Sequence, residues 1–220
     1  MFLGHFGVAL AAKRLAPKTS LGTLLLAAQF ADLLWPVFLV MGWETAQIDP
    51  GNTRVTPLNF TSYPISHSLL TQIGFGIGLG LIFYALRRGD SGAGKAAFVL
   101  AACVPSHWVL DWIVHRPDLP LTPWSLKYHG LGLWNSLPIT LALEFGIYGA
   151  GLALYLRQTK AKDAVGRYAF WLLVFFLAGL WLGTLFGPPA PNAKVLAWSA
   201  LAIWLTVPWI AWADRHRALN

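Results

Sequence analysis

The residues most able to do chemistry lie in one apolar stretch, Ser106-His107-Trp108-Val109-Leu110-Asp111-Trp112-Ile113-Val114-His115. His107, Asp111 and His115 are each four residues apart, so on a helix they project from one face. Imidazole and carboxylate groups one helical turn apart reach the same point without distorting the backbone, as ligands of a divalent ion must. The spacing alone is common, but a helix otherwise built of Trp, Val, Leu and Ile carries such groups at a large cost inside a bilayer. The pattern therefore predicts a metal site on this helix.

Further candidates come from other apolar segments. Asp32 and Glu144, like Asp111, are carboxylates within segments long enough to cross a membrane, where an ionised group costs several kcal/mol and is usually functional. His5 lies in the N-terminal apolar stretch, and His67 begins a later one. We expect Glu144 and His115 to act in catalysis as proton-transfer groups. The expected metal ligands are His5, Asp32, His67, His107 and Asp111.

Several of these residues have a structural alternative. His5 can bond a backbone carbonyl at a helix end, and Asp32 can pair with Gln29 on the same segment. His67 can simply lie at a helix end whose N-cap is Ser66. One ion is nevertheless the simpler explanation of so many costly groups at one depth in the membrane.

The elements that must position these residues are membrane helices. Of the 220 residues, 56% are hydrophobic and 11% are charged, whereas soluble domains carry about 25% charged residues. Apolar runs of about 20 residues, enough to cross the hydrocarbon core of a bilayer, recur along the chain. The prediction is an all-α polytopic membrane bundle of about six spans after a short N-terminal half-helix. The expected spans are Leu21–Gly42, His67–Leu86, Ala96–His115, Ser136–Leu156, Tyr168–Leu185 and Lys194–Trp212.

These spans predict one integral-membrane domain over residues 1–220, with a metal-site half (1–135) and a set of C-terminal transmembrane helices (136–220). Alternate connections between the spans differ in charge. Twelve of the sixteen Lys and Arg residues fall on one side, which predicts that this side and the C-terminus are cytoplasmic in a multi-pass protein of the cytoplasmic (inner) membrane. The twelve are Lys13, Arg14, Lys18, Arg87, Arg88, Lys95, Arg157, Lys160, Lys162, Arg167, Arg215 and Arg217.

The same topology explains the net charge of +7. No interleaving of aromatic and basic residues accompanies it, so nucleic acid is not an expected partner. The single Cys103 excludes an intramolecular disulfide. On the outer side, two long loops, Trp43–Ser66 and Arg116–Asn135, are of a length that is often functional.

The order of the motifs resembles a known family. His5 precedes a Gly-containing apolar stretch, and there follow Ala31-Asp32-Leu33-Leu34-Trp35-Pro36, Ser66-His67-Ser68-Leu69-Leu70, and Ser106-His107 to Asp111. This order, over roughly the first 120 residues, is similar to that of the YdjM-type (DUF457-like) membrane-bound metal-dependent hydrolases. Where that family often has a Pro-Asp-Leu-Asp-His run, this chain lacks the second Asp and the His. More distantly, the order is similar to the ligand layout of zinc-dependent phospholipases C.

These observations favour a membrane-embedded metal-dependent hydrolase. The expected cofactor is a divalent ion, most readily zinc, with manganese or iron as alternatives. A metal-bound water would be the nucleophile, Asp32 or Glu144 would accept its proton, and His115 would donate to the leaving group. The expected partners are the lipid bilayer and a lipid-like substrate, such as a lipid phosphate ester whose charge Arg116 and Lys127 could neutralise. The alternative is a non-catalytic protein for metal binding, transport or structure, whose His and Asp residues pack helices together.

Overall fold

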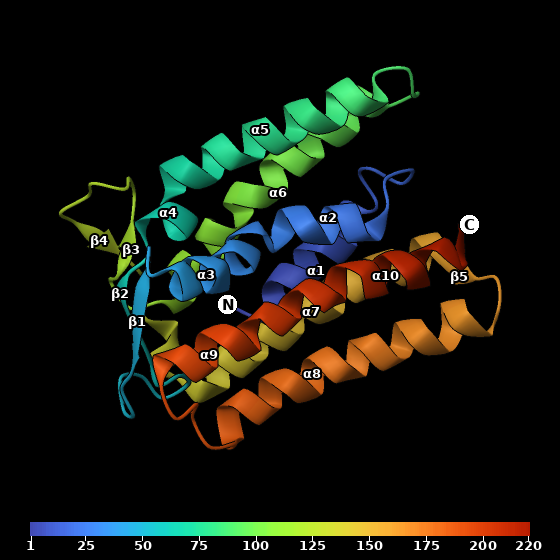
Figure 1. Cartoon of the computed structure of the whole chain (residues 1–220). Helices are drawn as coiled ribbons and strands as arrows, with labels where there is room; N and C mark the ends of the chain where they lie inside the picture. The colour runs from blue at the N-terminus through green and yellow to red at the C-terminus, as the bar shows by residue number, and fades with distance from the viewer.

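Long apolar helices dominate the computed structural model, which describes residues 1–220 (Figure 1). Five helical segments are long and apolar enough to cross a membrane, or six if a bent pair counts as one span. The predicted all-α membrane bundle of about six spans is therefore confirmed. The five are α5 (Leu69–Arg87), α6 (Ala93–Val114), α7 (Leu137–Gln158), the π-helical turn η2 (Val165–Ala169) with α8 (Phe170–Phe186), and α9 (Ala193–Ala200) with η3 (Leu201–Leu205) and α10 (Thr206–Arg215).

The first predicted span is not continuous. It divides into α2 (Leu21–Ala28) and α3 (Phe30–Met41), which meet at Gln29 with a bend of 59°. The side chain of Gln29 is fully buried and has no hydrogen-bond partner. Asp32 consequently lies in the first turn of α3, where the helix dipole favours a carboxylate. The break thus brings a helix C-terminus and an acid to the same depth.

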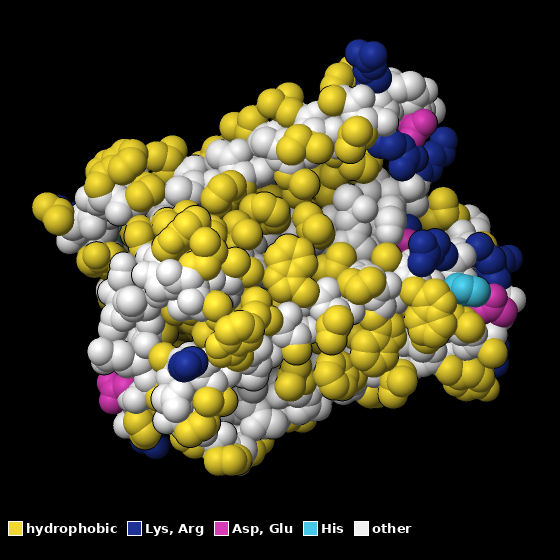
Figure 2. All heavy atoms as spheres, in the orientation of Figure 1, with side chains coloured by type: hydrophobic (Ala, Val, Ile, Leu, Met, Phe, Trp, Pro, Cys, Tyr) yellow, Lys and Arg dark blue, Asp and Glu magenta, His cyan; other side chains and the backbone are white.

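One end of the bundle gathers the basic residues. There the strands β5 (Thr159–Ala161) and β6 (Arg217–Leu219) pair antiparallel. Beside them, Lys13 at the end of α1 (Leu3–Ala12) forms a buried 2.7 Å ion pair with Asp214 of α10. Figure 2 shows Lys and Arg side chains at this end and hydrophobic side chains over the middle of the bundle. The Lys- and Arg-rich connections, which the sequence assigns to one side of the membrane, therefore lie at one end of the structure.

The other end carries a small layer of strands and short helices. β1 (Thr45–Ile48) pairs with β2 (Leu58–Ser62), and β3 (Leu119–Pro120) pairs with β4 (Tyr128–His129), both antiparallel. The one-turn helix α4 (Pro64–His67) and the 3-10 turn η1 (Leu133–Asn135) complete this layer. The two long loops expected from the sequence form it, and they close the bundle over the ends of α3 and α6 (Figure 1).

The short helix α1 lies inside the bundle, with most of its side chains buried. It packs closely on α7 because glycines face each other. A Cβ added to Gly151 would lie 2.1 Å from the carbonyl oxygen of Gly7, and one added to Gly7 would lie 2.6 Å from that of Ile147. This close approach holds α1, and with it His5, at a fixed distance from α7.

Gly151→Ala is predicted to lower the free energy of unfolding by about 1–3 kcal/mol, because the added methyl group forces α1 away from α7. Thermal unfolding in detergent checks this. Gly149→Ala is the matched control, since a Cβ there meets nothing within 4 Å. This variant should not be destabilised, because Ala has a higher helix propensity than Gly. Equal stability of the two variants would contradict the packing of α1 on α7.

Candidate metal centre

The middle of the bundle brings together the five predicted ligands. His107 and Asp111 lie one turn apart on α6, and both are about 1% exposed. His5 comes from α1, Asp32 from α3 and His67 from the end of α4. The cluster contains two groups of three residues, and within each group the possible ligand atoms all lie within 4.8 Å of one another. The groups are His5, His107 and Asp111, and Asp32, His67 and His107.

The distances in this cluster are those of a ligand shell. The Nε2 atom of His107 lies 3.2 Å from Oδ2 of Asp111 and 3.6 Å from Oδ1 of Asp32. The Nε2 atom of His67 lies 3.6 Å from Oδ1 of Asp32 and 3.7 Å from Oδ2 of Asp111. Two ligand atoms bound to one tetrahedral ion at about 2.0–2.1 Å are about 3.3 Å apart. The cluster therefore has the size that a single small ion requires.

The hydrogen bond of His107 fixes its proton. Its Nδ1 atom lies 3.0 Å from the carbonyl oxygen of Ala28, the last residue of α2. A carbonyl oxygen can only accept, so Nδ1 carries the hydrogen, and the neutral imidazole presents its Nε2 lone pair to the cluster. This Nε2 atom is buried and has no hydrogen-bond partner. The break between α2 and α3 thus supplies the acceptor that orients the His107 ring.

A second chain of hydrogen bonds fixes His67. The Ser66 hydroxyl donates to Oε2 of Glu44 at 2.6 Å, and Ser66 Oγ lies 2.7 Å from Nδ1 of His67. Because the only hydroxyl proton goes to the carboxylate, Nδ1 of His67 must donate to Ser66 Oγ, which leaves the Nε2 lone pair free. Glu44 is itself held by the amide hydrogens of Ile65 and Ser66, each at 2.8 Å. The chain is of the kind that orients metal-binding histidines through their second nitrogen.

His115 is held in a similar way but lies further out. Its Nδ1 is 2.9 Å from Oδ1 of Asp118, and its Nε2 is 3.9 Å from Oδ2 of Asp111. The Tyr63 hydroxyl donates to the same Oδ1 of Asp118 at 2.7 Å. Burial raises the pKa of Tyr63 well above its usual value, and the Asp118 charge raises it further, so the phenol keeps its proton. His115 therefore belongs to a buried Tyr–Asp–His group at the edge of the metal centre.

His5 stacks directly on His107. The ring centroids are 3.5 Å apart, and the planes differ by 6°. The Nε2 atom of His5 lies 3.1 Å from Oδ1 of Asp111, which the amino group of Met1 also contacts, and its Nδ1 has no partner. The N-terminal helix therefore reaches the cluster, a contact that the sequence alone does not predict.

Glu144 lies beside the centre without joining either group of three. Its two carboxylate oxygens accept hydrogen bonds from the backbone N–H groups of Phe2 at 2.8 Å and Gly4 at 2.9 Å. These amides begin α1, whose N-terminus has no side-chain cap of its own. Glu144 therefore ties the start of α1 to α7, and its expected part in proton transfer stays a prediction.

The donors face one another in a way that only positive charge stabilises. Lone pairs of His67 and His107 and the carboxylates of Asp32 and Asp111 converge in an interior where unpaired charge is costly. A buried polar atom without a partner costs about 1–3 kcal/mol, and Nε2 of His107 is such an atom. A divalent ion bound here would be a partner for all of them. The buried His and Asp residues can therefore hold a metal ion.

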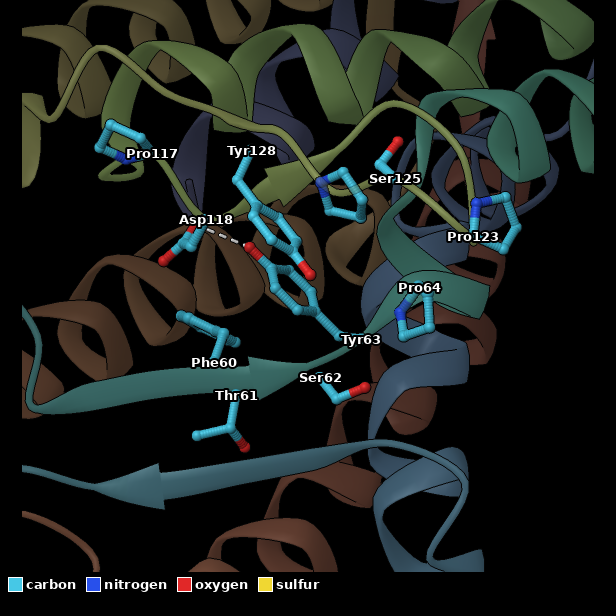
Figure 3. Close-up of a pocket in the computed structure, with 11 residues that line it drawn as sticks. Phe60, Thr61, Ser62, Tyr63, Pro64, Pro117, Asp118, Pro123, Ser125 and Tyr128 are labelled. Atoms are coloured by element: carbon cyan, nitrogen blue, oxygen red, sulfur yellow. Dashed lines mark hydrogen bonds between the residues drawn. The ribbon is translucent and has the colours of Figure 1, made fainter.

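The outer layer covers this centre with aromatic side chains. The Trp134 ring packs on His115 with centroids 4.1 Å apart, and the Tyr63 ring lies 5.1 Å from that of His67. A pocket of about 240 Å³ opens on the far side of Tyr63, where the Tyr63 to Asp118 hydrogen bond forms part of its wall (Figure 3). Within the cluster only Asp32 is noticeably exposed, with 25% of its side chain accessible. The approach to the centre therefore runs past Asp32.

Three details differ from the sequence expectations. Ser66 is not the N-cap, because Ser68 caps α5 by accepting from the N–H of Thr71. Arg116, expected to face a phosphate, instead bonds Asp118 and two Asn side chains of the β1–β2 hairpin. Glu44 was not expected to have a role. A charged Glu side chain is common in a solvent-exposed loop, so the sequence gives no sign that Glu44 has a structural role. Only the folded structure shows that Glu44 is buried, with 1% exposure.

No protein-family model matches the sequence, and no curated protein or solved structure matches it either. The resemblance to the YdjM-type hydrolases therefore stays a prediction, which rests on the motifs alone.

Ser66→Ala is predicted to weaken metal binding about 10–100-fold, because it removes the acceptor that fixes the His67 ring. Competition with a chromogenic chelator measures the affinity. Ser68→Ala, two residues away, is the matched control: it loses a helix cap worth about 1 kcal/mol but touches no ligand. If both variants bind metal as the wild type does, the hydrogen bonds that link Glu44, Ser66 and His67 do not orient a ligand.

Proposed function

We propose that this protein is a membrane-embedded metal-dependent hydrolase that acts on an amphipathic phosphate ester. The observation that carries the proposal is the convergence of the His67 and His107 lone pairs on Asp32 and Asp111, with the second nitrogen of each ring already occupied. Structural His–carboxylate pairs need no such orientation of the lone pairs. A ligand shell does.

Zinc is the proposed ion. Imidazole nitrogens combined with carboxylate oxygens at these separations suit zinc, and manganese or iron are the alternatives. The two groups of three share Nε2 of His107, which has one lone pair. They therefore describe one ion position, or two alternative positions for one ion.

The residues around the ion have distinct roles in this proposal. When bound, a divalent ion activates water as a nucleophile and polarises the scissile group. Asp32, the accessible carboxylate of the cluster, accepts the proton that the nucleophile loses. The Asp118 carboxylate holds Nδ1–H of His115. Burial lowers the pKa of this imidazole, and the charges of Asp111 and Asp118 oppose that fall; in its doubly protonated form His115 gives the Nε2 proton to the leaving group.

The surroundings support a substrate with an apolar part. Aromatic side chains close the outer side of the centre, and Asp32 lies on a membrane-spanning helix pair. A substrate that reaches Asp32 from between the spans must tolerate hydrocarbon while presenting a hydrolysable polar group. A lipid phosphate ester in the cytoplasmic membrane meets both demands. We place the basic end and the C-terminus in the cytoplasm, as the charge asymmetry favours.

The broken span favours a second candidate, an ion transporter. Discontinuous helices bind ions in transporters, and here the break at Gln29 directly contacts the ligand His107. Transport also needs a polar path to the opposite end. Between the centre and the basic end lies an apolar core that includes Leu10, Leu24 and Leu100, each at most 2% exposed. That core favours the hydrolase.

His107→Ala and Asp111→Asn are predicted to abolish metal binding, while the wild type carries a near-stoichiometric ion. Inductively coupled plasma mass spectrometry on detergent-purified protein, prepared without chelator or histidine tag, checks this. His216→Ala is the matched control, since His216 pairs with Asp163 at the basic end. A folded wild type that takes up no ion, even after incubation with zinc, manganese and iron, would refute the metal centre.

His115→Gln is predicted to keep the metal but to lower kcat about 10²–10⁴-fold on dioleoyl phosphatidic acid, because the leaving alkoxide needs a proton. On p-nitrophenyl phosphate, whose leaving group is a stable anion, the loss is predicted to be small. His129→Gln in β4 is the control for the outer layer. An equal loss on both substrates would show that His115 does not act as the proton donor.

A further inference from the structure

A second feature lies at the basic end of the bundle, away from the metal centre. A cavity of about 610 Å³ opens between the α1–α2 turn and the α5–α6 turn. It extends over the first turn of α6 to Ala96, eleven residues before the ligand His107. At about 1.5 Å per residue, the cavity is about 16 Å from the centre along the helix. It therefore cannot be part of the metal site.

The cavity carries an excess of positive charge. Lys18, Arg87 and Lys95 line it, and Asp90 is the one acid among the lining residues. Arg87 is paired with Asp90. The side chains of Lys18 and Lys95 form no ion pair and no hydrogen bond within the chain. Both lysines are exposed, so their ammonium groups are free to bind an anion in the cavity.

The walls next to these charges are apolar. Leu15 and Phe83 line the cavity. Beside it, Leu86 of α5 and Phe98 of α6 are 78% and 75% exposed, so an apolar helix surface continues from the cavity along the bundle. In a chain that crosses a membrane, this surface faces lipid. The occupant must then be anionic at one end and apolar at the other.

We propose that the cavity binds an anionic phospholipid, with its phosphate between Lys18 and Lys95 and its acyl chains along the α5 and α6 surface. Basic pockets between spans at the membrane surface bind such head groups. The N-terminus of α6 adds to the site, because its N-cap Gly92 provides no side-chain cap and leaves backbone N–H groups for an acceptor. The bound lipid links the α1–α2 turn to the α5–α6 turn.

Native mass spectrometry tests the site with purified protein in equal amounts of dioleoyl phosphatidylcholine and dioleoyl phosphatidylglycerol. The wild type is expected to retain phosphatidylglycerol preferentially. Replacing one lysine is expected to reduce this preference roughly fivefold, and Lys18→Gln with Lys95→Gln about twenty-fold. Inorganic phosphate at millimolar concentration is expected not to displace the lipid, because it lacks the apolar part.

The matched control is Lys160→Gln with Arg167→Gln, which removes the same charge from the same end but outside the cavity. It is expected to keep the preference. An equal loss in both double variants would assign the effect to diffuse surface charge, and no preference in the wild type, or displacement by phosphate, would equally overturn the site. Thermal unfolding in detergent, measured on each variant, shows whether the bundle is folded independently of the metal centre.

Discussion

The organisation of this protein depends on one electrostatic constraint: electron-pair donors of four side chains point at one another inside a membrane bundle. Without a bound cation, the lone pairs of His67 and His107 and the charge of Asp32 would have no positive partner, and Asp111 would have only the Met1 amino group. The surrounding hydrogen bonds do not relieve this arrangement. They enforce it, because each imidazole has its proton fixed on the side away from the cluster.

Much of the fold serves to bring these donors together. With His5, the five candidate ligands come from four separate elements, α1, α3, α4 and α6, and only α6 supplies two of them. The break at Gln29 gives His107 its acceptor and lets Asp32 start a new helix. Glycine contacts bring α1 against α7, and Glu144 binds the first amides of α1. The outer layer contributes Glu44 and the aromatic cover. Glu144 and Glu44 thus position the elements and side chains around the cluster, while the neighbouring His and Asp residues are the candidate ligands.

The sequence predicts the spans well, because about 20 apolar residues have one stable arrangement in a bilayer. It also predicts the candidate ligands, since Asp32 and Asp111 are too costly in apolar helices to occur there without a partner. It does not predict the break at Gln29, because hydropathy continues through it. The sequence offers Ser66 as a helix cap in the structural alternative for His67, whereas Ser66 links Glu44 to His67, a contact that depends on how two loops meet. Hydrogen-bond partners that are distant in the chain leave no local pattern.

X-ray absorption at the zinc K-edge of the purified, zinc-loaded protein tests whether these side chains bind a metal ion. Zinc held by the His and Asp side chains should show a first shell of nitrogen and oxygen at about 2.0–2.1 Å, with the multiple scattering of coordinated imidazole. That imidazole signal should weaken in His67→Ala and persist in His216→Ala. A shell of water oxygens alone, or one unchanged by His67→Ala, would contradict the claim that the buried lone pairs converge to hold a metal ion.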